Sequence, residues 1–227
     1  MRGKLIVFEG LDGSGKATQL EMLKKRLVGQ GFKVASTECP RYDKFYGRLT
    51  GRYLAGEFGA KEEVSPYLAS LLYASDRLNE REDILKWLEE NDFVLVNRYV
   101  PSSEAFLGAR FLGIGERKQF IEWLNVMEYD INKLRKPHLV MFLDMPPEIG
   151  QQLVLDKGHR EYMNGTEQDI HEKDIDFQKH VREVYKELSQ RDNWIKIECA
   201  PENDLRSKED IAEELWKIIL PLLPPKT

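Results

Sequence analysis

A glycine-rich stretch near the start of the chain limits its possible folds more than any other feature. Residues 8–19 read FEGLDGSGKATQ, and they continue the apolar run Leu5–Phe8. Gly10, four further residues, Gly15 and Lys16 between a strand and a helix are typical of a loop that wraps around phosphates. Glycines let backbone N–H groups turn inward, the helix start adds partial positive charge, and the lysine reaches the terminal phosphates. The stretch therefore predicts a nucleotide-binding α/β domain.

Short apolar runs recur along the chain between longer helical patterns. Five of them are predicted strands: Leu5–Phe8, a run around Val34, Phe93–Val96, Leu139–Leu143 and Trp194–Ile197. Strands that alternate with helices usually pair in parallel. We expect a three-layer α/β fold of the P-loop NTPase class, with a five-stranded parallel sheet flanked by helices. One domain is expected to cover residues 1–227.

Helical periodicity marks the segments between these strands. One helix is predicted to begin at Lys16 and to end near Gly29 or Gly31. Others are predicted over residues 65–91, with or without a break, 177–188 and 211–219. The least apolar region, residues 156–176, is typical of a mobile surface segment over a site, and we place a lid at about 156–170.

Composition excludes several classes of protein. The 227 residues are 41% hydrophobic and 32% charged, as in a globular domain, and the net charge of −5 argues against broad contact with a polynucleotide. Two cysteines, Cys39 and Cys199, are too few for a disulfide framework or a zinc site, which fits a reducing interior. No apolar run is long enough for a signal peptide or a membrane span. We expect a cytoplasmic protein with no membrane partner.

The residue after the loop lysine departs from the usual pattern. Ser or Thr normally stands there and gives a hydroxyl to Mg²⁺, whereas this chain has Ala17. The metal would then be held by phosphate oxygens, by water, or by a neighbour such as Thr18 or a strand-end carboxylate. Glu9 and Asp144 are candidates, although either could pair with a lysine instead. The metal ligands stay unassigned, while the evidence for nucleotide binding is unaffected.

Side chains suited to an acceptor molecule follow other predicted strands and helices. Arg41 in CPRYD and Arg98 in FVLVNRY lie at the carboxyl edge of the sheet, where ligands of such folds bind. Two arginines could grip a phosphomonoester, or each could pair with a carboxylate at the surface. Tyr73 and Arg77 are four residues apart and would share a helix face that suits a flat base. Alternatively, the tyrosine lies in the core and the arginine is exposed.

Taken in order, these segments resemble the thymidylate kinases. FEGLDGSGKATQ, CPRYDKFYG, LLYASDR, NRYVPSSEAFLGAR and HEKDIDFQKHVREVY are similar to segments of that family along nearly the whole chain. The resemblance implies transfer of the γ-phosphoryl group of ATP to dTMP with Mg²⁺, a mobile lid, and usually a homodimer.

The resemblance also implies individual site residues. ATP would be bound by Gly10, Leu11, Asp12, Gly13, Ser14, Gly15, Lys16, Ala17 and Thr18. The acceptor dTMP would be bound by Asp12, Arg41, Tyr73, Arg77, Arg98, Ser102, Ser103 and Phe106. Catalysis would depend on Lys16, Asp12, Arg98 and Arg160 of the lid, with Lys157 as the alternative to Arg160. A lid residue is needed because Gly13 stands where some members carry a basic residue.

Further departures from the family pattern leave other functions open. Asn97 replaces the aspartate of an Asp-Arg-Tyr motif, so it can accept a hydrogen bond from metal-bound water but brings no charge. Ser103 and Leu107 stand where Asn and Gln are frequent, which affects contacts with the base. The alternatives are a kinase for another nucleotide or a deoxynucleoside, and a nucleotide-binding protein that has lost catalysis.

Overall fold

A five-stranded sheet forms the centre of the computed structural model, which describes residues 3–156 and 174–224. The strands are β1 (Lys4–Glu9), β2 (Val34–Glu38), β3 (Phe93–Asn97), β4 (Leu139–Asp144) and β5 (Trp194–Glu198). All neighbouring strands are parallel, in the order β2-β3-β1-β4-β5. The predicted strands and the predicted sheet are confirmed.

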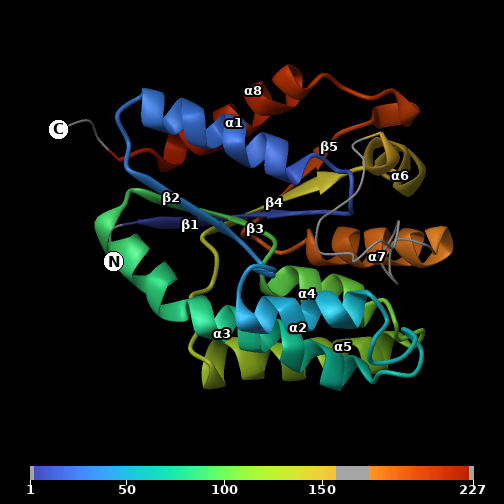
Figure 1. Ribbon diagram of the computed structural model, residues 1–227. Helices are drawn as coiled ribbons and strands as arrows, with labels where there is room; N and C mark the ends of the chain where they lie inside the picture. The colour runs from blue at the N-terminus through green and yellow to red at the C-terminus, as the bar shows by residue number, and fades with distance from the viewer. Residues whose placement is uncertain (1–2, 157–173, 225–227) are drawn as a thin grey trace.

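Helices cover both faces of the sheet (Figure 1). One face carries α1 (Lys16–Gly29) and α8 (Lys208–Ile219), and the other carries α3 (Pro66–Glu90), α4 (Val100–Gly108) and α7 (Ile175–Leu188). Farther out lie α2 (Phe45–Leu54), α5 (Ile114–Asn125) and the π-helical segment η1 (Val126–Ile131). Helix α6 (Pro147–Leu155) follows β4, and short 3₁₀ turns cover Pro201–Asn203 and Leu220–Leu222.

Successive side chains of a strand point to opposite faces of the sheet, and here they form two apolar layers. Leu5 and Val7 of β1 pack toward α3, α4 and α7, whereas Ile6 and Phe8 pack toward α1 and α8. All four side chains are fully buried. A strand buried on both faces is apolar at every position, which explains why the continuous runs in the sequence predicted these strands.

The predicted helices over 65–91, 177–188 and 211–219 correspond to α3, α7 and α8, and α3 is one unbroken helix. Helical periodicity in the sequence did not indicate α2, α4, α5 or α6. Of the predicted lid, only Asp156 belongs to the described residues; Lys157 and Arg160 lie outside them. None of the helices within residues 3–156 and 174–224 is long and apolar enough to cross a membrane.

Strand order determines where a ligand can bind. The central strand β1 has β3 on one side and β4 on the other, so the order reverses there. In open parallel sheets, ligands bind beyond the carboxyl ends of the strands at such a point. Glu9, Glu38, Asn97 and Asp144 end four of the strands and therefore mark the edge that carries the site.

Candidate active site

Residues 10–15 connect β1 to α1 in a tight loop. Gly10, Gly13 and Gly15 have φ values of +141°, +74° and +87°, which favour glycine. Gly15 is also the N-cap residue of α1, and the first turn of that helix contains no acidic side chain. The partial positive charge of the helix start is therefore directed at the loop without a carboxylate of that turn to offset it.

Lys16 folds back into this loop. Its Nζ donates hydrogen bonds to the carbonyl oxygens of Gly10 (3.1 Å) and Leu11 (2.7 Å) and to Ser14 Oγ (3.4 Å). The lysine is only 6% exposed. The ammonium group thus lies within the curl of the loop, the position from which it can meet a bound phosphate.

The loop packs closely on α6. A Cβ atom at Gly13 would lie 1.9 Å from the carbonyl oxygen of Gly150, and a Cβ at Gly150 would lie 2.6 Å from that of Asp12. Backbone atoms fill the space on both sides, so a side chain at position 13 requires α6 to move. The structure thus explains the absence of a basic residue at position 13.

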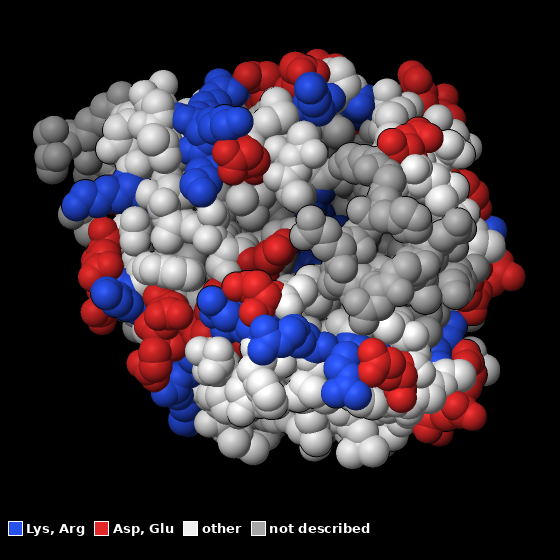
Figure 2. Space-filling view, viewed as in Figure 1, with Lys and Arg blue, Asp and Glu red and all other residues white. Residues whose placement is uncertain are grey.

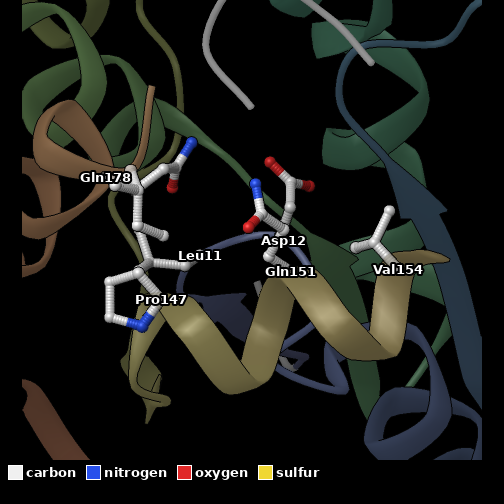
Figure 3. A pocket seen from close by; sticks show the side chains of 7 residues that line it. Leu11, Asp12, Pro147, Gln151, Val154 and Gln178 are labelled. Atoms are coloured by element: carbon white, nitrogen blue, oxygen red, sulfur yellow. The ribbon is translucent and has the colours of Figure 1, made fainter. Parts of the chain in front are cut away.

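A small pocket lies beside this contact. Figure 3 shows Asp12 at the pocket with Pro147, Gln151 and Val154 along one side of α6 and Gln178 from α7. Helix α6 leads directly into the region that the sequence predicts as the lid. Helix α6 therefore packs on the phosphate loop at Gly150 and directly precedes the predicted lid in the chain.

Arg98 and Asp12 meet where β3 and β1 end. Arg98 Nη2 lies 3.0 Å from Asp12 Oδ1, and Nη1 donates to Ser102 Oγ at 3.3 Å. The guanidinium carbon lies 5.1 Å from the centroid of the Phe106 ring. Arg98 has φ +64°, a left-handed conformation that costs a non-glycine residue about 1–3 kcal/mol and is concentrated at functional sites. Four predicted site residues are thus brought together.

Glu9 supports this group from the end of β1. The fully buried carboxylate accepts hydrogen bonds from Tyr99 N (2.9 Å), Ser102 Oγ (2.6 Å) and Tyr185 OH (2.8 Å). Burial raises the pKa of Glu9 above its usual 4.5, although Arg98 and these donors act in the opposite direction. Because both oxygens are engaged, Glu9 orients Ser102 beside Arg98 and is poorly placed to bind a metal. The sequence had not pointed to Tyr185.

Arg41 is held by two carboxylates of α3. Its Nε lies 3.8 Å from Asp76 Oδ1 and 3.3 Å from Glu80 Oε2, and its backbone N–H donates to Asp76 Oδ2 at 3.0 Å. Burial raises the pKa values of both carboxyl groups. Among the described residues, neither Arg41 Nε nor Asp76 Oδ1 has a hydrogen-bond partner. Arg41 Nη2, however, donates to the carbonyl oxygen of Asp76 at 3.3 Å, so the guanidinium is held against α3. Contact of Arg41 with an acceptor phosphate stays a prediction.

Arg77 is buried and ion-paired, so the alternative in which this arginine is exposed is wrong. It is 2% exposed and pairs with Glu128 of η1 through both Nε (3.0 Å) and Nη2. Nη2 also donates to Ser103 Oγ at 3.0 Å. Tyr73 is partly buried and packs edge-to-face on Tyr53, with ring centroids 6.3 Å apart. A base contact by Tyr73 or Arg77 stays a prediction.

Ala17 and Asn97, the two residues that depart from the family pattern, line one hollow of about 550 Å³ at the ends of β2 and β3. Figure 2 shows a hollow on this face with acidic and basic side chains around it. Asn97 Nδ2 donates to Glu38 Oε2 at 3.5 Å, and Asn97 Oδ1 is buried with no hydrogen-bond partner among the described residues.

Asp144, a candidate metal ligand from the sequence, pairs with Arg182, at 2.5 Å between Oδ1 and Nε. Within the described ranges, no three His, Cys, Asp or Glu residues form a metal site.

Comparison with known proteins establishes the family. The family model for thymidylate kinase matches residues 8–211. The chain belongs to the thymidylate kinase family. Among curated thymidylate kinases, that of Halothermothrix orenii is 32% identical over 95% of this chain and 96% of its own length. That of Plasmodium falciparum is 30% identical over 96% and 91%, respectively.

A solved structure confirms the thymidylate kinase fold. The thymidylate kinase from Candida albicans matches with a TM-score of 0.74 and 24% sequence identity, covering 96% of this chain and 91% of that chain. The match includes the parallel sheet and the flanking helices, in agreement with the three-layer fold that the sequence predicts.

The sequence missed the residues that hold the predicted ones in place. They are Glu38, Glu80, Glu128, Arg182 and Tyr185. Only Glu80 carried a usable signal, because it lies four residues after Asp76 and so shares its helix face. Glu128 is 51 residues from Arg77, and no local pattern connects them.

Proposed function

We propose that this protein transfers the γ-phosphoryl group of ATP to dTMP and releases ADP and dTDP. The observation that carries the proposal is Arg98, which has a strained backbone and is paired with Asp12 of the loop that surrounds the Lys16 ammonium group. The guanidinium of Arg41, at the same edge of the sheet, suits an acceptor that already carries a phosphate. A nucleoside acceptor would bring no phosphate for it to hold, so the deoxynucleoside kinase is the weaker alternative.

The chemistry follows from charge and position. A bond forms between an oxygen of the dTMP phosphate and the γ-phosphorus, while the bond from the γ-phosphorus to the β–γ bridging oxygen breaks. The acceptor phosphate is largely ionised near neutral pH, so no side chain has to remove a proton. Lys16 and the loop N–H groups would hold the donor phosphates, and Arg98 and Arg41 would align the acceptor.

Magnesium is part of the proposal. When bound, it would neutralise part of the negative charge of the donor phosphates. Mg²⁺ in such sites keeps several waters and uses few protein ligands, which is compatible with the loss of the hydroxyl at Ala17. Asn97 Oδ1, which has no hydrogen-bond partner in the described part of the chain, fits as an acceptor for a hydrogen of metal-bound water.

A panel of acceptors tests the proposal. The purified protein is incubated with ATP, Mg²⁺ and dTMP, dUMP, dCMP, AMP or thymidine in turn, and ADP release is followed. We expect the highest kcat/KM with dTMP. Turnover with thymidine but not with dTMP would support the deoxynucleoside alternative. Binding of ATP and dTMP without turnover would support a protein that has lost catalysis.

We also infer a homodimer. Support comes from α3, on which Leu68, Leu71 and Leu78 are 62%, 45% and 43% exposed and follow one another at helical spacing. A second copy of the chain would cover this apolar row. Light scattering at micromolar concentration should give a dimer, and Leu71→Asp should shift it toward monomer; a monomeric parent would contradict the inference.

The cytoplasm is the location that we propose. Cys39 and Cys199 are both buried free thiols, which suits a reducing compartment. Fractionation of cells that express the full chain, followed by immunoblotting, would test this directly.

A further inference from the structure

We propose that Glu38 supplies, on the metal-binding side of the site, the carboxylate that position 97 lacks. The inference rests on the proposed function, because it requires ATP and Mg²⁺ to bind at the loop. Glu38 belongs to none of the motifs that carry the resemblance described above, and it enters only through the structure.

The geometry joins Glu38 to both departures from the family pattern. Glu38 and Asn97 are the last residues of β2 and β3, and they are register partners in the sheet. Glu38 Oε2 lies 3.5 Å from Asn97 Nδ2. Ala17, in the first turn of α1, lines the same hollow as these two residues. Ala17, which lacks the usual hydroxyl, Asn97, which replaces the usual aspartate, and the Glu38 carboxylate therefore line one hollow.

The orientation of the Asn97 amide depends on this carboxylate. With Nδ2 directed at Glu38, the atom that remains is Oδ1, which is buried without a hydrogen-bond partner among the described residues. The reversed amide would place two oxygens in contact, which is repulsive. A buried oxygen without a donor is unfavourable, and a water held by a cation would supply the missing hydrogen. Glu38 would thus supply the negative charge, and Asn97 would accept the hydrogen bond from metal-bound water. In the family pattern, one aspartate at position 97 could do both.

Three other carboxylates at or just after the strand ends are already engaged. Glu9 accepts three hydrogen bonds, Asp12 pairs with Arg98, and Asp144 pairs with Arg182. Glu38, by contrast, is exposed and makes a long contact with a neutral amide. Its carboxylate can turn toward a cation without breaking an ion pair in the described part of the chain, whereas Asp12 and Asp144 cannot. One carboxylate together with phosphate oxygens and water is a usual set of Mg²⁺ partners.

Calorimetry of nucleotide binding tests the role of Glu38 without relying on turnover. The affinity for a non-hydrolysable ATP analogue is measured with and without Mg²⁺, and the ratio of the two Kd values gives the enhancement by the metal. The variants are Glu38→Gln, the exchange Glu38→Gln with Asn97→Asp, and the control Asp83→Asn. Asp83 is an exposed carboxylate that lines the same hollow, so its removal changes the local charge equally.

We expect Glu38→Gln to reduce the enhancement about tenfold, the order of loss seen when a group that orients a metal ligand is removed. Metal-free binding should stay as in the parent. The control should keep the parent enhancement, and the exchange should regain it, because a carboxylate returns to position 97. Circular dichroism confirms that each variant is folded.

Unchanged enhancement in Glu38→Gln, or an equal loss in Asp83→Asn, would overturn the role of Glu38 while leaving the proposed function intact. Failure of the exchange to regain the enhancement would also overturn it, since the carboxylate would then not be interchangeable between the two positions. A parent that does not bind the analogue at all would overturn the proposed function itself, and the role of Glu38 with it.

Discussion

At the residue scale, the site consists of arginines that buried or partly buried carboxylates hold in place. Arg98 is paired with Asp12, Arg77 with Glu128, and Arg41 with carboxylates of α3. Pairs of this kind fix the direction of a guanidinium before a ligand arrives, which lowers the entropy that binding has to overcome. Removing one partner of a buried pair leaves a charge without compensation.

Arg98→Ala should weaken dTMP binding much more than ATP binding. The side chain lies with Asp12 and Ser102 on the predicted acceptor side. Loss of a charge-assisted contact with a phosphate should cost about 2 kcal/mol, which is roughly 30-fold in Kd. Calorimetric titration with each nucleotide measures both effects. Equal losses for dTMP and ATP would count against the assignment.

Glu128→Gln should destabilise the fold by about 3 kcal/mol, because the buried Arg77 would lose its counter-charge while the shape of the side chain is kept. Urea unfolding measures the change. Glu122→Gln, an exposed position on the neighbouring helix α5, is the matched control and should stay within about 0.5 kcal/mol of the parent. A similarly small effect for Glu128→Gln would mean that the ion pair does not stabilise the fold.

Glu9→Gln should change how stability depends on pH. Burial raises the folded-state pKa of Glu9, so its contribution to stability is full below about 4.5 and is lost as pH rises through the raised pKa. The free energy of unfolding of the parent should therefore fall relative to that of the variant as pH increases from 4.5. An amide can still accept from Tyr99 N and donate to the nearby hydroxyls. Parallel stability curves from pH 4.5 to 8 would refute this.

At the element scale, α6 determines how the phosphate loop is supported. Gly150→Ala should lower the turnover number, since the new Cβ would lie 2.6 Å from the carbonyl oxygen of Asp12 and force α6 or the loop to shift. Gly115→Ala is the control: it is also helical, but its Cβ would meet nothing within 4 Å. The control should keep full activity and gain up to about 1 kcal/mol of stability. Equal behaviour of the two variants would show that the close contact has no function.

Elements differed in how well the sequence predicted them. Strands β1, β3 and β4 were predictable because residues buried on both faces give unbroken apolar runs, and α1 because the glycine motif determines its start. Strands β2 and β5 form the edges of the sheet, are less buried and contain polar residues, so their apolar signal is weaker. Helices α4 and α6 are short and have a proline in their first turn, a signal that periodicity alone does not use. Helices α2 and α5 pack mainly on other helices, so no strand pattern marks their positions.

At the scale of the whole molecule, the order of the strands brings the donor and acceptor sides together. Residues at strand ends, such as Asp12 and Arg98, could be assigned to one site from the sequence because parallel strands end at one edge. The residues that hold Arg77 and Glu9 could not be predicted, since Glu128 and Tyr185 come from distant helices whose packing depends on the tertiary structure. The sequence therefore predicted which residues lie together better than it predicted the contacts that hold them.

The most direct test of phosphate transfer by this loop is the initial rate of dTDP formation from ATP and dTMP, measured in the parent and in Lys16→Ala across a range of Mg²⁺ concentrations. Lys16 lies within the loop and contacts its carbonyl oxygens, so its loss should remove charge neutralisation and leave the sheet and helices unchanged. We predict turnover in the parent and a loss of at least about 100-fold in the variant, with the same circular dichroism spectrum. A parent that forms no dTDP at any Mg²⁺ concentration, or a variant that keeps nearly the parent rate, would contradict this mechanism.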